Sequence, residues 1–279
     1  MSFVEHKQRR KLVKIAAQIE SADTLFVDWD GCVFRNHRII PGADRFLRRR
    51  SRKICIVSNN STDLPSQFAS VLASAGVEIP ESRIFLAGHA AVDHVVNSFP
   101  KKRVFLLGSK AMRRYAREQG VALVKENPDL VLLLRDSKFS YGKLRASANF
   151  VRDGAALIVA NSDTSHPGDS GIVPETGALL AAITTCLDRQ PRSSTIIGKP
   201  SPLLFELALN RVGTQPDNTL VIGDNPITDI EGAARLGIPS VLIDPVQGVT
   251  LSSIHDACLV RFDDRRHSYR RLDPRDDLS

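Results

Sequence analysis

Short runs of apolar residues recur along the chain, and each of them ends in a polar or acidic cluster. Apolar runs without a polar face are typical of strands that are buried on both faces of a parallel sheet. We predict strands of this kind at residues 25–27, 54–57, 195–197, 220–222 and 241–243.

Segments with helical spacing of apolar residues lie between these runs. We predict helices at 64–75, 202–212 and 227–236, each followed by a glycine that is typical of a helix C-terminus. A further helix over 5–22 carries its apolar residues on one side. This alternation predicts an α/β fold built on a doubly wound parallel sheet, which binds ligands at the carboxyl ends of its strands.

The middle third of the chain repeats the alternation and predicts a second α/β unit inserted into the first. We expect strands at 104–107, 130–134 and 157–160, with helices at 109–119 and 141–152. Segments near 80–82 and 190–194 are interpreted as linkers. The predicted domains are a first part of the core at 1–83, an inserted domain at 84–190 and a second part of the core at 191–279.

The C-terminal end of the chain is densely charged. From Leu259 onward it holds six Arg and five Asp. We expect a short closing element there, followed by a solvated tail.

Composition and charge narrow the function classes. The chain has 279 residues and a formal net charge of +7, since 38 Lys and Arg outnumber 31 Asp and Glu. The basic residues are spread and aromatic residues make up only 6% of the chain, so no nucleic-acid partner is expected. The four cysteines are scattered and give neither a zinc-site spacing nor a disulfide framework. Without a long apolar run or a signal-peptide pattern, we expect a cytoplasmic protein with no membrane partner.

The first candidate for chemistry is the acidic turn Asp28-Trp29-Asp30-Gly31, which follows the predicted strand at 25–27. A carboxylate at a strand end can attack phosphorus, and a second carboxylate two residues later can act as acid and then as base. The alternative is an ordinary acidic turn, because Asp and Gly favour turns. Trp29, between the two carboxylates, is assigned to the core.

Two further polar segments follow predicted strands. The hydroxyl and amide groups of Ser58-Asn59-Asn60-Ser61 suit phosphate oxygens, although the same residue types also favour helix N-caps. Lys199 can neutralise a phosphoryl group, or it can be an ordinary surface lysine. Neither segment is decisive when it is taken alone.

The segment from Gly223 to Ile230 places Asp224 and Asp229 around a strand-to-helix turn. Mg²⁺ is usually held by one or two carboxylates together with waters and substrate phosphate, so these two residues are candidate ligands. The alternative is an ordinary capped helix start. Because the carboxyl ends of parallel strands meet at one sheet edge, the four polar clusters together favour a single site.

Taken in order, these residues resemble the signature of the haloacid dehalogenase-like (HAD) hydrolase superfamily. That signature is D-x-D-G, then Ser or Thr, then Lys, then G-D-x-x-x-[ST]-D. Its positions are occupied here by Asp28, Asp30, Ser58, Lys199, Asp224 and Asp229.

The S-N-N-S segment, the long insertion before Lys199, and the stretches at 139–144 and 160–163 resemble subfamily IIA of this superfamily. That subfamily includes p-nitrophenyl phosphatase-like, pyridoxal-phosphate and phosphoglycolate phosphatases and NagD-like nucleotidases. The resemblance implies an HAD Rossmann-like core with an inserted α/β cap domain of the C2 type. One position departs from the pattern, because Glu175 stands where the subfamily usually has the first glycine of P-G-x-G, which bears on the local loop geometry and on substrate choice.

The resemblance also implies a role for each residue. Asp28 is the nucleophile that forms an aspartyl-phosphate, Asp30 is the acid and base, and Ser58 and Lys199 hold the phosphoryl oxygens. Mg²⁺ is the implied cofactor, held by Asp28, Asp224 and the backbone carbonyl of Asp30, with Asp229 bound less directly. The implied substrate contacts are Asn59 and Asn60 from the core and Asp163 and His166 from the cap.

The function implied by the resemblance is hydrolysis of a small phosphate ester, of the sugar phosphate, nucleotide, phosphoglycolate or pyridoxal phosphate class. A response-regulator receiver is excluded, because its acidic residues, Ser/Thr and Lys come in a different order. A phosphotransferase or phosphomutase with the same intermediate stays open. A non-catalytic regulator that binds a phosphometabolite is disfavoured by the intact carboxylates. By the same resemblance, a homodimer through the caps is expected.

Overall fold

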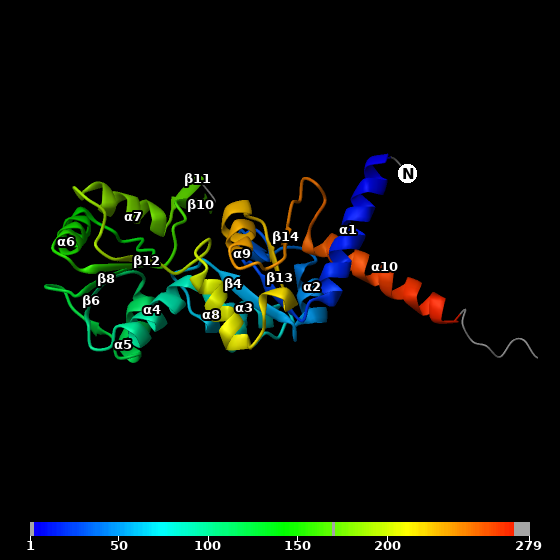
Figure 1. Cartoon of the computed structure of the whole chain (residues 1–279), viewed down its shortest axis with the longest axis horizontal. Helices are drawn as coiled ribbons and strands as arrows, with labels where there is room; N and C mark the ends of the chain where they lie inside the picture. Colours follow the sequence, from blue (N-terminus) through cyan, green and yellow to red (C-terminus); the bar gives the residue numbers. More distant parts are fainter. Residues whose placement is uncertain (1–2, 169–170, 271–279) are drawn as a thin grey trace, which may run out of the picture.

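The computed structural model describes residues 3–168 and 171–270. Figure 1 shows an elongated molecule, with one α/β unit at an end, a second α/β unit in the middle and two long helices at the other end. These helices are α1 (Phe3–Ser21) and α10 (Leu251–Arg270). None of the described helices, including these two, is both long enough and apolar enough to cross a membrane.

The middle unit, here called the core, is built on a five-stranded parallel sheet with the order β14-β13-β1-β4-β5. Counted along the chain, this order is that of a doubly wound sheet, as predicted. Its strands are β1 (Thr24–Val27), β4 (Ile54–Ser58), β5 (Ile84–Leu86), β13 (Thr219–Gly223) and β14 (Ser240–Leu242).

The inserted unit, here called the cap, has its own five-stranded parallel sheet in the order β12-β9-β8-β6-β7. The predicted α/β core with an inserted α/β cap is therefore confirmed. The cap strands are β6 (Arg103–Leu107), β7 (Ala122–Leu123), β8 (Leu130–Leu133), β9 (Ala156–Val159) and β12 (Ser194–Ile196).

Helices cover both sheets, and two short hairpins complete the fold. The longer helices are α2 (Ala43–Arg50), α3 (Pro65–Ser74), α4 (Ala87–Ser98), α5 (Lys110–Glu118), α6 (Tyr141–Arg152), α7 (Thr176–Thr185) and α8 (Leu203–Val212). The short ones are η1 (Glu81–Arg83), η2 (Pro216–Asn218), the π-helical η3 (Pro226–Glu231) and α9 (Gly232–Ala234). The hairpins pair β2 (Phe34–Arg35) with β3 (Arg38–Ile39), and β10 (Ser165–Gly168) with β11 (Gly171–Pro174).

Two strands belong to a different sheet from the one that the predicted domain limits assign to them. β5 pairs with β4 in the core sheet, although 84–190 was expected to be the inserted domain. β12 pairs with β9 in the cap sheet, although 191–279 was expected to be core. Short apolar runs such as these predict a buried strand but carry no information about its partner, which is why the assignment is wrong for both.

The C-terminal closing element is longer than predicted. α10 begins at Leu251, before the charged segment, and packs its Ile254 and Cys258 into the same buried cluster as Ile15 and Ile19 of α1. The one-sided apolar pattern of the N-terminal helix is thus buried as expected. The tail predicted beyond α10 lies outside the described residues.

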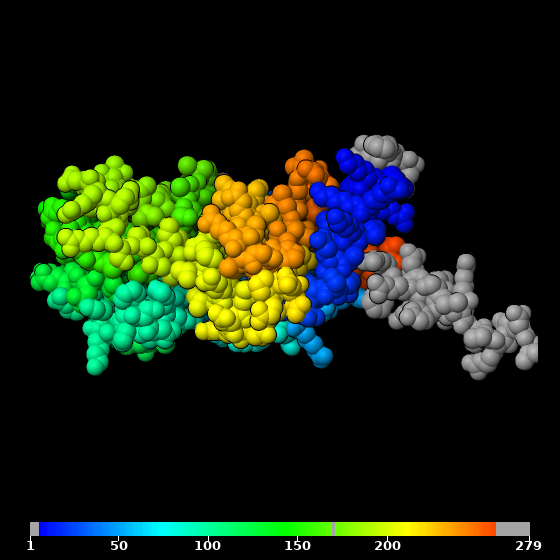
Figure 2. All heavy atoms as spheres, in the orientation of Figure 1, coloured from blue at the N-terminus to red at the C-terminus, as the bar shows by residue number. Residues whose placement is uncertain are grey.

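Alternate residues of both sheets point into one apolar layer that the core and the cap share. Helices α4, α5 and α8 contribute buried side chains to the same layer. The core sheet supplies Phe26, Cys55, Val57 and Val221, and the cap sheet supplies Val104, Leu106, Leu130, Leu132 and Ile158. In Figure 2 the segment around α8, in yellow, lies directly against the green surface of the cap. Because the layer is continuous, we expect the two units to unfold together.

Phe205 of α8 tests this expectation. Its ring is 1% exposed and stacks on Phe26 of the core sheet with the ring centroids 6.1 Å apart. We predict that Phe205→Ala lowers the free energy of unfolding by about 3–5 kcal/mol, because it leaves a cavity in the shared layer. Urea unfolding followed by fluorescence and circular dichroism measures this loss, and we expect one transition by both probes.

The matched control is Leu207→Ala on the same helix, where the side chain is 41% exposed. We expect this change to cost about 1 kcal/mol or less, because little buried surface is lost. Two separate transitions in the unchanged protein would contradict the shared layer.

Candidate active site

The acidic clusters meet where the strand order of the core sheet reverses. β1 lies between β13 and β4, so the residues that follow these three strands gather at one edge. Asp28 follows β1, Asp224 follows β13, and Ser58 is the last residue of β4. Ligands of doubly wound sheets bind at this position, because the loops on its two sides diverge and leave a crevice. The sequence-based expectation of one site at one sheet edge is met by these residues.

Lys199 reaches this edge from the cap sheet and not, as predicted, from a core strand. It follows β12, yet its Nζ lies 2.6 Å from Asp28 Oδ1 and 2.6 Å from Asp229 Oδ1. The side chain is 2% exposed, which excludes the alternative of a surface lysine. Burial would lower the pKa of the ammonium group, but the two carboxylates outweigh this effect and raise it. Lys199 therefore carries a full positive charge inside the site.

The carboxylates around Lys199 outnumber it. Oxygen atoms of Asp28, Asp224 and Asp229 lie within 4.8 Å of one another. Burial raises the pKa of Asp28 and of Asp224, and the charge of Asp229 adds to both shifts, while Lys199 opposes them. A hard divalent cation fits this set, because it binds oxygen ligands and would remove the excess negative charge. The carboxylate of Asp30 is not part of the group.

Gly31 allows Asp224 to approach the acidic turn. Its φ is +80°, a conformation that favours glycine, and a Cβ at this position would overlap the Asp224 carboxylate. The glycine of the D-x-D-G motif thus has a geometric role that the sequence pattern alone does not reveal. Trp29 is 4% exposed and packs against Phe34 and Phe68, so its assignment to the core is confirmed.

Asp30 faces the open side of the crevice. Although solvent reaches this residue, desolvation raises the pKa of its carboxyl group to about 6. Lys199 and His166 oppose the shift, and Glu175 and Asp224 add to it. A carboxyl group with this pKa can both donate and accept a proton near neutral pH. Asp30 and Asp28 thus differ in environment, one open to solvent and the other buried beside an ammonium group.

The S-N-N-S segment divides into residues that face the site and residues that shape the turn. Ser58 is buried, and its Oγ accepts a hydrogen bond from the backbone N–H of Asn60 at 3.0 Å. The Asn60 side chain donates to Asp63 and accepts from two backbone N–H groups of the same turn. These bonds form a local turn, and the N-cap of the next helix, α3, is Leu64, so the N-cap alternative is wrong for this segment. The Asn60 side chain is occupied by its own turn, and its predicted contact to substrate is not supported by these bonds.

Asn59 links the core to the cap. Its Nδ2 donates to Asp163 Oδ2 at 2.9 Å and to the backbone carbonyl of Lys199 at 2.8 Å. Its buried Oδ1 has no hydrogen-bond partner among the described residues. Burial raises the pKa of Asp163, and the hydrogen bond from Asn59 opposes the shift. The structure therefore brings the predicted core residue Asn59 and the predicted cap residue Asp163 together.

His166 belongs to a second cluster, on the cap side of the crevice. Its Nδ1 lies 2.8 Å from Glu175 Oε1, and Arg135 Nη1 donates to the same oxygen at 3.2 Å. Burial raises the pKa of Glu175, and Arg135 and His166 oppose the shift. Sequence analysis did not find Arg135. It lies two residues after the end of β8, so the pattern of charged residues after a buried strand could have indicated it.

Comparisons with known proteins agree with this site. Residues 25–122 match the family described as haloacid dehalogenase-like hydrolase, and residues 196–253 match one described as HAD-hydrolase-like. A dihydroxyacetone phosphatase of Corynebacterium glutamicum is 30% identical over 219 residues, which cover 77% of this chain and 78% of the relative.

Two solved structures share the fold over most of their length. A 4-nitrophenylphosphatase of Thermotoga maritima superposes with a TM-score of 0.78 at 25% identity, over 86% of this chain and 99% of that one. A glycerol phosphate phosphatase of Mycobacterium tuberculosis in complex with calcium gives 0.74 at 27% identity, over 85% and 76% of the two chains. The chain therefore belongs to the haloacid dehalogenase-like hydrolases, in subfamily IIA with the NagD-like and p-nitrophenyl phosphatase-like enzymes, and it is a phosphomonoesterase of this type.

Proposed function

We propose that this protein is a Mg²⁺-dependent hydrolase of a small phosphorylated metabolite and that it works through an aspartyl-phosphate intermediate. The observation that carries this proposal is the position of Asp28, a buried carboxylate held by Lys199 at 2.6 Å beside Asp224 and Asp229. A nucleophile must be held in place and its charge balanced, and this arrangement does both.

Asp28 attacks the phosphorus atom, and the ester oxygen leaves on the opposite side. Lys199 neutralises charge on the phosphoryl group and holds Asp28 in one orientation, because it also bonds to Asp229. Ser58, buried beside Asp28 at the end of β4, offers its hydroxyl to a phosphoryl oxygen. Phosphoryl transfer needs mainly positioning and charge stabilisation, so a few fixed groups are sufficient.

Asp30 transfers the protons. With its pKa raised to about 6, mainly by desolvation, it can protonate the leaving oxygen and then accept a proton from the water that opens the aspartyl-phosphate. Its exposed position gives that water access. This access favours hydrolysis over a phosphotransferase or phosphomutase, which would need water excluded. The same carboxyl group disfavours a regulator that only binds its ligand.

Mg²⁺ would be held by Asp28, Asp224 and the backbone carbonyl of Asp30, with Asp229 in support through its bond to Lys199. When bound, the cation screens the charges of the nucleophile and of the phosphoryl group. The excess of carboxylates over Lys199 supports a cation at this position.

The substrate belongs to the class of small phosphate esters, such as sugar phosphates, nucleotides, phosphoglycolate or pyridoxal phosphate. Two similar proteins are named for dihydroxyacetone phosphate and glycerol phosphate hydrolysis, and these names support a small polyol ester. We expect Asn59, Asp163 and His166 to contact its leaving group, from the core and from the cap.

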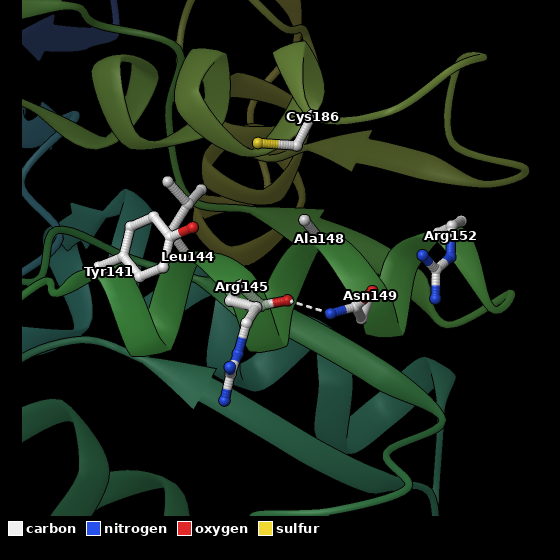
Figure 3. Close-up of a pocket in the computed structure, with 7 residues that line it drawn as sticks. All are labelled: Tyr141, Leu144, Arg145, Ala148, Asn149, Arg152 and Cys186. Carbon is white, nitrogen blue, oxygen red and sulfur yellow. Dashed lines mark hydrogen bonds between the residues drawn. The ribbon is translucent and has the colours of Figure 1, made fainter.

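We propose further that the enzyme is cytoplasmic and forms a homodimer through its cap. The four cysteines are free, which suits a reducing compartment. A pocket of about 210 Å³ lies between α6 and Cys186, the residue after α7 (Figure 3), and Tyr141 at its edge is 81% exposed. This end of the cap lies away from the crevice, and an exposed aromatic side chain there is suited to a contact between subunits.

The nucleophile is tested with Asp28→Asn. We expect the hydrolysis of p-nitrophenyl phosphate in Mg²⁺ to fall by about a thousandfold or more, because an amide cannot form the aspartyl-phosphate. The fold should stay intact, since Lys199 keeps its bond to Asp229, and circular dichroism checks this. Asp217→Asn, at an exposed carboxylate of η2, is the control and should keep full activity. Retention of most of the rate by Asp28→Asn would rule out this mechanism.

The metal site is tested by thermal unfolding. Because a ligand that binds only the folded state stabilises it, Mg²⁺ should raise the Tm of the unchanged protein at constant ionic strength. Asp224→Asn should lose most of this rise, whereas Asp153→Asn, an exposed carboxylate of the cap, should keep it. An equal rise in Asp224→Asn would show that the cation binds elsewhere.

The dimer is tested by sedimentation. We expect a species of about twice the chain mass of 30.7 kDa, which Tyr141→Ser shifts toward the single chain. Observation of the single chain alone, over a wide range of concentrations, would contradict the dimer.

A further inference from the structure

Two side chains from separate segments of the cap, Arg135 and His166, share one carboxylate oxygen of a third, Glu175. Oε1 of Glu175 accepts from Arg135 Nη1 at 3.2 Å and lies 2.8 Å from His166 Nδ1. Arg135 follows β8, His166 is in β10, and Glu175 follows β11. The Glu175 side chain is 15% exposed and that of Arg135 is 27% exposed, so solvent screens their interaction only in part. Glu175 therefore neutralises the positive charge of Arg135.

This cluster faces the reacting groups. Arg135 and Thr176, the residue after Glu175, both contact Ser61, which lies three residues after Ser58 in the segment that leaves the catalytic edge of the core sheet. Hydrogen bonds hold the cluster against the core, because Ser61 Oγ accepts from the backbone N–H of Arg135 at 3.1 Å and lies 3.2 Å from Thr176 Oγ1. Asp30 protonates the leaving oxygen in the proposed mechanism, so the leaving group extends toward this cluster.

On the leaving-group side of the crevice, Lys199, Arg135 and His166 each already lie against a carboxylate. Lys199 is hydrogen-bonded to the carboxylates of Asp28 and Asp229, and Arg135 is hydrogen-bonded to that of Glu175. Arg35 lies at the opposite, metal-binding edge, 3.9 Å from Asp224 and bonded to the carbonyl of Gly31. Asp163 adds another carboxylate to the cap side. A negatively charged leaving group would meet the carboxylates of Glu175 and Asp163 there, and Glu175 would compete with it for Arg135.

We infer that Glu175 makes the enzyme selective for phosphate esters whose leaving group is an uncharged alcohol, by neutralising Arg135 and repelling a carboxylate. This inference rests on the phosphatase function proposed above and narrows its substrate class to polyol, sugar and nucleoside esters, with phosphoglycolate disfavoured. Specificity is obtained here by repulsion of the wrong ligand as much as by attraction of the right one. The position is the one where the resembling subfamily usually has glycine, so this device belongs to this chain.

Two esters that differ in one group test the inference. Phosphoglycolate ends in a carboxylate, and hydroxyethyl phosphate carries a hydroxymethyl group in its place. We expect the unchanged enzyme to prefer hydroxyethyl phosphate by about tenfold or more in kcat/KM, with most of the difference in KM. Glu175→Gln should shift this ratio about tenfold toward phosphoglycolate, because it leaves Arg135 free for the carboxylate.

Glu175→Gln tests the negative charge of this side chain separately from its hydrogen bond to α7. Glu175 is also the N-cap of α7 and accepts from the backbone N–H of Thr176 at 3.3 Å, a bond that a glutamine oxygen can replace. The double variant Glu175→Gln with Arg135→Gln should lose the gain for phosphoglycolate. Arg135→Gln alone should reject phosphoglycolate more strongly than the unchanged enzyme, so this variant tests the inference even if Glu175→Gln does not fold. Glu118→Gln removes an exposed partner of Arg114 on α5 and should leave the ratio unchanged.

The outcomes separate the two proposals. If the unchanged protein hydrolyses neither ester nor p-nitrophenyl phosphate in Mg²⁺, the phosphatase function itself is wrong, and the inference falls with it. If it hydrolyses them but prefers phosphoglycolate, or if Glu175→Gln and Arg135→Gln both leave the ratio unchanged, the inference is wrong and the phosphatase function stands.

Discussion

The active site depends on one buried ammonium group. Lys199 bonds to Asp28 and Asp229 at 2.6 Å each and so joins the segments that follow β1, β12 and β13. A buried ammonium group without these partners would be strongly destabilising, and the two carboxylates would repel each other without the ammonium. Each charge is thus tolerated only because the others are present. The nucleophile is held in place before any substrate arrives, which is the positioning that phosphoryl transfer requires.

The cap is fixed over this centre by apolar packing and by a few polar bonds. The layer that both sheets share packs the cap against the core. Asn59 bonds to Asp163 across the crevice, and Ser61 contacts Thr176 a short distance away. The groups of the cap that meet the leaving group are therefore placed as firmly as those of the core. This is the condition under which a single charge such as that of Glu175 can discriminate between substrates.

Charge is distributed unevenly across the crevice. The metal edge holds an excess of carboxylates, which a divalent cation would balance, whereas on the cap side Arg135 and His166 both lie against Glu175. On both sides of the crevice, burying a charge costs free energy. Burial therefore raises the pKa of five carboxyl groups of the site, those of Asp28, Asp30, Asp163, Glu175 and Asp224. The net charge of +7 therefore says little about the site itself, where carboxylates dominate.

The sequence by itself determined the α/β class and the acidic residues after the core strands, because apolar runs mark buried strands and a parallel sheet delivers their ends to one edge. Its motif order was enough to indicate the family. Only the tertiary structure decided that β12 belongs to the cap sheet, that Asn60 is occupied by its own turn, and that Arg135 meets Glu175. The reason is physical. Burial and helical spacing are local properties of the chain, whereas the choice of a strand partner or a charge partner is made between segments that are far apart in sequence.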